Sequence, residues 1–189
     1  MLKKELRKIY KEQRANISSK EKLKLDDLML LQLQKMYFED SLTLLTYWPI
    51  GNNNEPNTHL YSSFLRHTIP GLQIAYPVSD FTDSSMKAIL INEETAYTTN
   101  QYGITEPKEG IELKPTDLDL IFVPLLICDE QGFRVGYGKG FYDKFLAQCK
   151  SDAITLGFNY FSPIDKIQDT DEYDIPLNYC ITPEHIYEF

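Results

Sequence analysis

The segment Arg134-Val-Gly-Tyr-Gly-Lys-Gly-Phe-Tyr-Asp143 places glycine at every second position of a short loop. Glycine adopts backbone conformations that other residues avoid, and it lets amide N–H groups come close to a ligand. An apolar run at 120–123 precedes the loop, and residues 141–148 are compatible with a helix after it. We therefore predict that the glycines join a strand to a helix N-terminus, where exposed amides and the helix dipole favour an anion such as phosphate.

Three charged residues of this segment favour phosphate binding over a plain turn. Lys139 supplies a mobile positive charge, Arg134 supplies a planar pair of donors, and Asp143 supplies a carboxylate that can bind Mg²⁺ beside phosphate oxygens. The segment is neither a Walker loop nor a dinucleotide fingerprint, because Lys139 is followed by Gly140 and the glycine spacing differs from both. A tight turn without a ligand is the alternative for the glycines alone. The whole segment predicts a site for a nucleoside triphosphate.

Outside this segment, apolar runs typical of strands alternate with helical patterns. Such alternation predicts an α/β fold with a mainly parallel sheet and helices on both faces, a Rossmann-like three-layer sandwich, formed by one domain over residues 1–189. Ligands of this fold class collect at the carboxyl ends of the strands. The helices expected are 2–15, one starting with a capping box at Ser18 and Glu21, 58–67 and 141–148. The strands expected are 42–48, 72–76 (stopped by Pro77), 86–91, 120–123, 154–158 and 178–182, with 102–107 an extended loop.

Composition describes an ordinary globular protein. The 189 residues are 42% hydrophobic, and they include no signal-like segment and no apolar stretch of membrane-spanning length, so we expect a cytoplasmic protein that does not enter a membrane. Cys128, Cys149 and Cys180 are widely spaced and form no CxxC pair, which argues against a disulfide framework or a zinc site. We expect them to be small buried residues.

The charge of the chain is −9 and is unevenly distributed. Residues 1–24 hold nine Lys and Arg against three acids, so the remainder carries −15. The acidic balance argues against a nucleic-acid binder, and any anionic substrate needs a local basic patch. The helix at 2–15 is the obvious source, because Lys3, Arg7, Lys11 and Arg14 form one stripe along it. A solvated helix face is the alternative for that stripe.

The segments Asp119-Leu-Ile-Phe-Val-Pro124 and Asp129-Glu-Gln-Gly-Phe-Arg134, with the glycine loop that follows, closely resemble the signature of the 5-formyltetrahydrofolate cyclo-ligase family. Further matches occur in family order over nearly the whole chain. They are Lys3 and Arg7, the strand from Tyr47 followed by Glu55 and Thr58, Tyr76-Pro77, Glu106-Pro107 and Ile181-Thr-Pro-Glu184. Where the family commonly has glycine after Val-Pro and tyrosine after the last glycine of the loop, this chain has Leu125 and Phe141.

The resemblance implies an enzyme that uses Mg²⁺ and ATP to convert 5-formyltetrahydrofolate to 5,10-methenyltetrahydrofolate, with release of ADP and phosphate. ATP would phosphorylate the formyl oxygen, and N10 would then close the ring. Such a reaction depends mostly on positioning and charge stabilisation. The expected partners are two small molecules, a reduced folate and ATP, and the expected state is a monomer.

The resemblance also implies roles for individual residues. The implied ATP-binding residues are Lys3, Arg7, Arg134, Val135, Gly136, Tyr137, Gly138, Lys139, Gly140, Phe141 and Tyr142. The implied folate-binding residues are Trp48, Glu55, Tyr102, Tyr137, Gly138, Lys139, Gly140 and Phe141. Lys139, Arg134 and Tyr142 would be catalytic, and Asp143 and Asp174 would bind Mg²⁺.

Several of these roles have structural alternatives. Asp143 would also favour a helix start, Asp174 lies in an acidic run that is ordinarily solvated, and aromatic residues at strand ends are often core residues. Glu106 is either functional or part of a proline turn. His59, His67 and His185 have no spacing typical of a metal site or a triad. For the whole chain, the alternatives are a small-molecule kinase and a non-catalytic nucleotide-binding or protein-interaction module.

Overall fold

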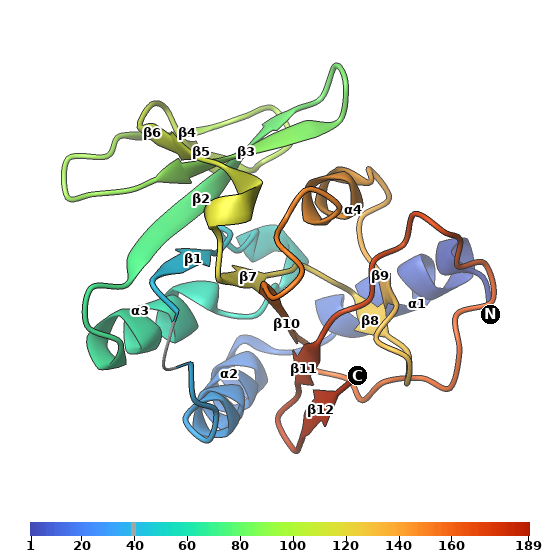
Figure 1. Ribbon diagram of the computed structural model, residues 1–189. Helices are drawn as coiled ribbons and strands as arrows, with labels where there is room; N and C mark the ends of the chain where they lie inside the picture. The colour runs from blue at the N-terminus through green and yellow to red at the C-terminus, as the bar shows by residue number, and fades with distance from the viewer. Residues whose placement is uncertain (39–40) are drawn as a thin grey trace.

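The computed structural model describes residues 1–38 and 41–189. Within them, the main sheet has eight strands in the order β12-β11-β10-β7-β1-β2-β3-β6 (Figure 1). The strands from β11 to β2 pair in parallel, and antiparallel partners extend the sheet at both edges. Its strands are β1 (Thr43–Leu45), β2 (Gln73–Asp80), β3 (Ser85–Leu90), β6 (Ile111–Leu113), β7 (Leu120–Phe122), β10 (Ile154–Phe158), β11 (Tyr179–Ile181) and β12 (Ile186–Glu188).

Two small antiparallel pairs and four α-helices accompany the main sheet in the described part of the chain. The pairs are β4 (Tyr97–Thr99) with β5 (Thr105–Pro107), and β8 (Ile127–Cys128) with β9 (Arg134–Val135). The helices are α1 (Lys3–Ala15), α2 (Ser19–Leu33), α3 (Thr58–Thr68) and α4 (Phe141–Leu146), with 3₁₀ turns at Gly51–Asn53 and Pro115–Asp117. Among the described helices, none has the length and apolar character needed to cross a bilayer.

Both faces of the central strands are buried. Successive side chains of a strand point to opposite faces, so Leu44 packs in the core with α2 and α3, whereas Leu45 packs in the core with α4. In the adjacent β7, Phe122 joins the first core and Ile121 joins the second. This double burial explains the continuous apolar runs, and it confirms the predicted α/β fold with helices on both faces.

The expected stop at Pro77 was wrong, because β2 continues through it to Asp80. In an antiparallel ladder, hydrogen-bonded residue pairs alternate with pairs that are not hydrogen-bonded. Ile74 is hydrogen-bonded to Ile91, so Pro77, three positions further along β2, falls at a pair that is not hydrogen-bonded, opposite Ala88. The missing N–H of Pro77 therefore faces the side of β2 where β1 has already ended, and no ladder bond is lost.

The sequence had suggested that the glycine loop directly follows the strand at 120–122, but in the structure it does not. The β8–β9 pair lies between them, and β9 leads into the glycines. Helix α1 contacts this pair (Figure 1). Leu6 of α1 is fully buried and belongs to one core cluster with Ile127 and Val135. The two ends of the chain therefore meet at the loop. The helix after the loop is also shorter than expected, since α4 ends at Leu146.

Glu106 has a structural role. It is only 6% exposed, and its carboxylate accepts bonds from Ser79 N at 2.8 Å and from Asn100 Nδ2 at 3.1 Å. These bonds attach the β4–β5 pair, which the sequence had predicted partly as a loop, to β2.

Asp26 on α2 is a buried acceptor that joins three elements. Its Oδ1 accepts from Asn57 N at 3.1 Å, Tyr61 Oη at 3.1 Å and Tyr160 Oη at 2.9 Å, and its Oδ2 accepts from Lys22 Nζ at 2.6 Å. The Asp26 side chain is 2% exposed.

We expect Asp26→Ala to lower the free energy of unfolding by roughly 3 kcal/mol, since it leaves buried donors without an acceptor. Urea denaturation of the purified variant measures this. Asp27→Ala is the matched control, because Asp27 is the next residue of the same helix and is exposed. Equal stabilities of the two variants would contradict the prediction.

Candidate active site

A cavity of about 460 Å³ lies between α1, the carboxyl end of β1, the glycine loop and the β2–β3 pair. It is lined by all but one of the residues assigned to the site from sequence: Lys3, Arg7, Trp48, Glu55, Tyr102, Arg134, Gly136, Tyr137, Gly138, Lys139, Gly140, Phe141, Tyr142, Asp143 and Asp174. The structure therefore gathers into one cavity residues from segments that are far apart in the sequence.

Val135 is the exception. Its side chain is fully buried with Leu6 and Ile127, and its carbonyl accepts from Leu126 N at 2.8 Å within the β8–β9 pair. The ATP contact expected for Val135 is therefore not supported, because its side chain serves the core and its carbonyl oxygen serves the ladder.

The cavity also has an apolar wall that was not predicted from the sequence. This wall contains Pro77, Phe81, Met86 and Ile104, which come from the β2–β3 pair and the β4–β5 pair. The sequence predicted a strand at 86–91, but nothing in that pattern indicated which strand end would face a ligand.

The glycine loop bends at two of its three glycines. Gly138 has φ of +89° and Gly140 has φ of +73°, values that other residues rarely adopt, whereas the φ of Gly136 is not positive. A Cβ on Gly138 would also come within 3.2 Å of the Arg7 guanidinium. Gly138 is therefore required both by its backbone conformation and by the close approach of Arg7.

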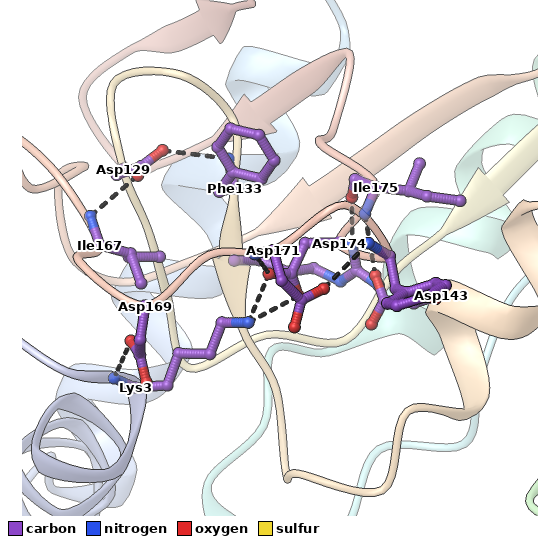
Figure 2. A network of polar contacts seen from close by, with 11 residues as sticks. Lys3, Asp129, Phe133, Asp143, Ile167, Asp169, Asp171, Asp174 and Ile175 are labelled. Atoms are coloured by element: carbon purple, nitrogen blue, oxygen red, sulfur yellow. Dashed lines mark hydrogen bonds and ion pairs between the residues drawn. The ribbon is translucent and has the colours of Figure 1, made fainter.

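Two cations of α1 reach the loop region, as the basic stripe predicted. Arg7 Nε donates to Gly136 O at 2.9 Å, and Lys3 Nζ donates to Asp174 Oδ1 at 2.6 Å. Figure 2 shows Lys3 extending from α1 toward Asp174, while its backbone N donates to Asp169 at 2.7 Å. The acidic connection 162–174 thus places carboxylates beside α1 and the cavity instead of forming a purely solvated run.

Arg134 and Asp143 form an ion pair at the cavity wall. Arg134 Nη2 donates to Asp143 Oδ1 at 2.9 Å, and Nη1 donates to Ile175 O at 2.5 Å. Asp143 Oδ1 also accepts from Ile175 N at 3.1 Å (Figure 2). Burial lowers the pKa of Arg134, and the charge of Asp143 opposes that shift. Arg134 therefore orients Asp143 in addition to lining the cavity.

Lys139 differs from these cations because it is exposed and has no hydrogen-bond or ion-pair partner among residues 1–38 and 41–189. Its ammonium lines the cavity on the loop between Gly138 and Gly140. Lys139 can therefore bind a phosphate without breaking a contact of the described structure.

Glu55 is 3% exposed although it lines the cavity. Ile50 N donates to Glu55 Oε2 at 2.6 Å, and Tyr137 Oη donates to Oε1. Burial raises the pKa of Glu55, and the two hydrogen bonds and the nearby Arg14 oppose this effect. A buried carboxylate of this kind suits a ligand with N–H donors.

Aromatic rings flank Glu55 and the loop. Trp48 packs edge-on against His59, with 4.5 Å between ring centroids, and lies 5.1 Å from the ring of Tyr97. His59 was not assigned to the site from sequence. It packs against Trp48 and is not part of the cavity lining. Tyr102 stacks on Phe81 at 4.1 Å.

Tyr142 brings a buried hydroxyl to the same cavity. Its Oη has no hydrogen-bond partner in the described structure, and burial raises its pKa. The group is therefore a neutral, buried O–H whose hydrogen has no acceptor in the described part of the chain.

The two predicted metal ligands lie on one wall of the cavity, but each is paired with a cation. Asp174 holds Lys3, and Asp143 holds Arg134 through Oδ1. Residues 1–38 and 41–189 contain no group of three or more His, Cys, Asp or Glu side chains suited to a metal ion. Mg²⁺ needs only one or two carboxylates when phosphate oxygens and waters complete its shell, so the pair fits a metal that arrives with a phosphate ligand.

Comparison with known proteins identifies relatives of this chain. The sequence model of the 5-formyltetrahydrofolate cyclo-ligase family matches residues 1–183. The chain is 28% identical over 165 residues to 5-formyltetrahydrofolate cyclo-ligase of Haemophilus influenzae, covering 78% of this chain and 87% of that protein. It is 28% identical over 123 residues to the Escherichia coli K12 protein of the same name, covering 63% and 68%. The solved structure of Aquifex aeolicus 5,10-methenyltetrahydrofolate synthetase superposes with a TM-score of 0.81 at 28% identity, covering 100% of this chain and 93% of that one.

Proposed function

Because this chain belongs to the 5-formyltetrahydrofolate cyclo-ligase family, we propose that it converts 5-formyltetrahydrofolate to 5,10-methenyltetrahydrofolate with consumption of ATP and release of ADP and phosphate. The observation that carries the proposal is the meeting of α1 with the glycine loop, because it puts Lys3, Arg7 and Lys139 around one cavity. We also propose that the protein acts as a cytoplasmic monomer.

The chemistry explains why such a site needs ATP. The oxygen of a formamide is a poor leaving group, so transfer of the γ-phosphoryl group to it produces a phosphate that can leave. The folate N10 attacks the activated carbon, the C–N bond closes the ring, and the C–O bond to phosphate breaks. The protein contributes alignment of the two substrates and positive charge around the transferring group.

The phosphate end of the site is formed by α1 and the glycine loop. Lys139 would contact the transferring phosphoryl group, while Arg7 fixes the loop through Gly136 O. Gly138 and Gly140 let the loop amides approach the phosphates. The helix dipole contributes less than the sequence had suggested, since α4 has six residues.

Asp143 and Asp174 are the residues we assign to Mg²⁺, which would neutralise charge on the phosphate oxygens. Lys3 holds the carboxylate of Asp174 in place, and Arg134 holds that of Asp143. Lys3 would donate to a phosphate oxygen of bound ATP in place of its contact with Asp174.

The folate end is formed by Glu55 and the aromatic residues. The buried carboxylate of Glu55 would accept hydrogen bonds from the donor edge of the pterin, and Trp48 would pack against its flat face. Tyr142 would donate its unpaired hydroxyl hydrogen near the reacting formyl group. These placements give each end of the cavity a different ligand chemistry.

The direct test mixes purified protein with 5-formyltetrahydrofolate, Mg²⁺ and ATP and follows the methenyl product by its absorbance. ATP-dependent formation of that product is the expected result. ADP release without a folate would instead favour a kinase acting on another acceptor, and absence of any turnover would favour a non-catalytic module.

We expect Lys139→Met to raise the KM for ATP about tenfold to a hundredfold, since one charge-assisted contact to phosphate is lost. The melting temperature should not change, because Lys139 is exposed and unpaired in the described structure. Steady-state kinetics and thermal unfolding measure the two quantities. Lys144→Met is the matched control, because Lys144 donates to Asp83 O at 3.0 Å outside the cavity lining. An unchanged KM in Lys139→Met would contradict the assignment.

A further inference from the structure

The side chain of Tyr137 connects the glycine loop to Glu55. Tyr137 lies between Gly136 and Gly138, and its hydroxyl donates to Glu55 Oε1 across 82 positions of sequence. The second oxygen of Glu55 accepts from Ile50 N at 2.6 Å. One carboxylate oxygen is therefore oriented by the loop at 136–140 and the other by its own turn.

Arg14 lies next to the Tyr137 hydroxyl that contacts Glu55. It is 1% exposed, although the basic stripe had suggested a residue of the solvated or phosphate-facing side of α1. Its Nη2 donates to Leu125 O at 2.6 Å, and its Nη1 lies 3.4 Å from Tyr137 Oη. Nε is buried without a partner in the described structure. The positive charge is thus kept inside the protein, beside Tyr137.

The direction of the chain of contacts follows from the donors present. A guanidinium only donates, so Tyr137 Oη accepts from Arg14 and its own hydrogen is directed to Glu55. Burial raises the pKa of Tyr137, and the nearby Glu55 charge adds to that shift, so the phenol keeps the hydrogen that it donates. The contact at 3.4 Å is long, and the charge of Arg14 acts mainly through the field it sets up.

Glu55 is faced by charged and titratable groups from several elements. Arg14 of α1 and Lys22 of α2 lower its pKa, in opposition to burial. The other facing groups are the tyrosines whose pKa burial raises: Tyr47, Tyr137, Tyr142 and Tyr160. They remain neutral near pH 7, so the two cations and the hydrogen bonds to Glu55 determine its ionisation there.

We propose that Arg14 and Tyr137 are positioning residues that hold the Glu55 carboxylate toward the folate end of the cavity and attach it to the glycine loop. This inference rests on the proposed role of Glu55 in binding the reduced folate. Neither residue touches the reacting atoms through its side chain in this arrangement. Because the Tyr137 side chain leaves the same loop that would hold ATP, the contact also links the two ends of the cavity.

The first test is Tyr137→Phe, which removes the hydroxyl and keeps the ring and the loop backbone. We expect the Glu55 pKa to rise, since a hydrogen bond to its charged form is lost. A carboxyl-¹³C NMR titration of the ligand-free protein measures this, with Glu55→Gln identifying the resonance. Tyr10→Phe is the matched control, because Tyr10 lies on α1 outside the cavity lining and packs on Phe161.

The second readout is affinity. We expect Tyr137→Phe to weaken binding of 5-formyltetrahydrofolate about tenfold and to change the affinity for ATP less than twofold. The acid limb of folate binding should move to higher pH, because Glu55 is protonated there. Trp48 is the only tryptophan of the chain and lines the cavity, so its fluorescence reports folate binding directly.

Arg14→Lys and Arg14→Gln separate charge from packing. The lysine variant keeps the charge and should leave the Glu55 pKa close to that of the wild type, whereas the glutamine variant should raise it. If Arg14→Gln does not fold, Tyr137→Phe alone decides. An unchanged Glu55 pKa and an unchanged folate affinity in Tyr137→Phe overturn the inference. If Tyr137→Phe shows these shifts but the wild-type protein forms no methenyl product, the proposed function is wrong and the positioning role of Tyr137 remains.

Discussion

Arg134→Met should abolish measurable turnover and lower the free energy of unfolding by about 2–3 kcal/mol. Arg134 is 5% exposed in its side chain and is the partner of Asp143, whose side chain is 27% exposed. Removing the guanidinium leaves Ile175 O without its donor and leaves Asp143 Oδ1 with Ile175 N as its remaining donor in the described structure. The partial exposure of Asp143 lets water replace some of the lost interaction, so the expected loss lies at or below the lower end of the roughly 3–5 kcal/mol range for broken buried pairs.

For a chain of this length, that loss corresponds to a melting temperature lower by roughly 5–10 °C. Calorimetry and the methenyl absorbance assay measure the two effects. Arg66→Met is the matched control, because Arg66 is exposed on α3 and lies outside the cavity lining. Arg134→Lys should recover part of the stability, because it keeps the charge but not the planar pair of donors. Wild-type kcat in Arg134→Met would show that neither the guanidinium nor the alignment of Asp143 matters to the reaction.

Glu55→Gln should reduce kcat/KM for 5-formyltetrahydrofolate by about 10²–10³, since the loss of a buried hydrogen-bonded charge costs several kcal/mol of binding. The substitution changes one atom and keeps the side-chain shape. The KM for ATP should stay within a factor of two, because Glu55 lies at the other end of the cavity from Lys139 under the proposed function.

Stability should move in the opposite direction from activity. The folded state raises the pKa of Glu55, so this residue binds a proton more tightly when folded, and its contribution to stability falls as pH rises through that pKa. A neutral glutamine mimics the protonated form, and the variant should melt at or above the wild-type temperature at pH 7. Loss of activity together with a large drop in melting temperature would instead indicate a folding defect.

The predictable part of the structure rests on elements that sequence patterns describe well. The capping signal at Ser18 starts α2 where expected, with Ser18 Oγ accepting from Glu21 N at 3.2 Å. The apolar runs at 43–45, 120–122 and 154–158 are central parallel strands, because burial on both faces leaves no room for alternation. The glycine loop and the α1 cations meet as the family pattern implied.

The strands that were not predicted from the sequence are too short to show a hydrophobic periodicity. Strands β4 to β6, β8, β9 and β12 have two or three residues each, and they depend on partners brought together by the rest of the fold. A loop expected at 102–107 becomes β5 only because 97–99 lies beside it.

The burial of Arg14 shows a second limit. Helical spacing places Arg14 on the same stripe as Lys3, but spacing does not say what covers each end of a stripe. In the structure the two residues have opposite environments, since Lys3 reaches the cavity rim and Arg14 is enclosed near Leu125. Arg14 is enclosed by a residue more than 100 positions away in the sequence, and a helical pattern does not reveal such a neighbour.

The contacts of α1 have a consequence for biosynthesis. Lys3 and Asp174 are separated by 171 positions, and Arg7 and Gly136 by 129. During synthesis the contacts of Lys3 and Arg7 can therefore form only after residues 174 and 136 have been added, whereas the other end of α1 already has a partner in Asn54, which donates to Arg14 O. Contacts between positions so far apart favour slow final assembly, and a chain that ends before residue 174 would lack the contact that Asp174 makes with Lys3.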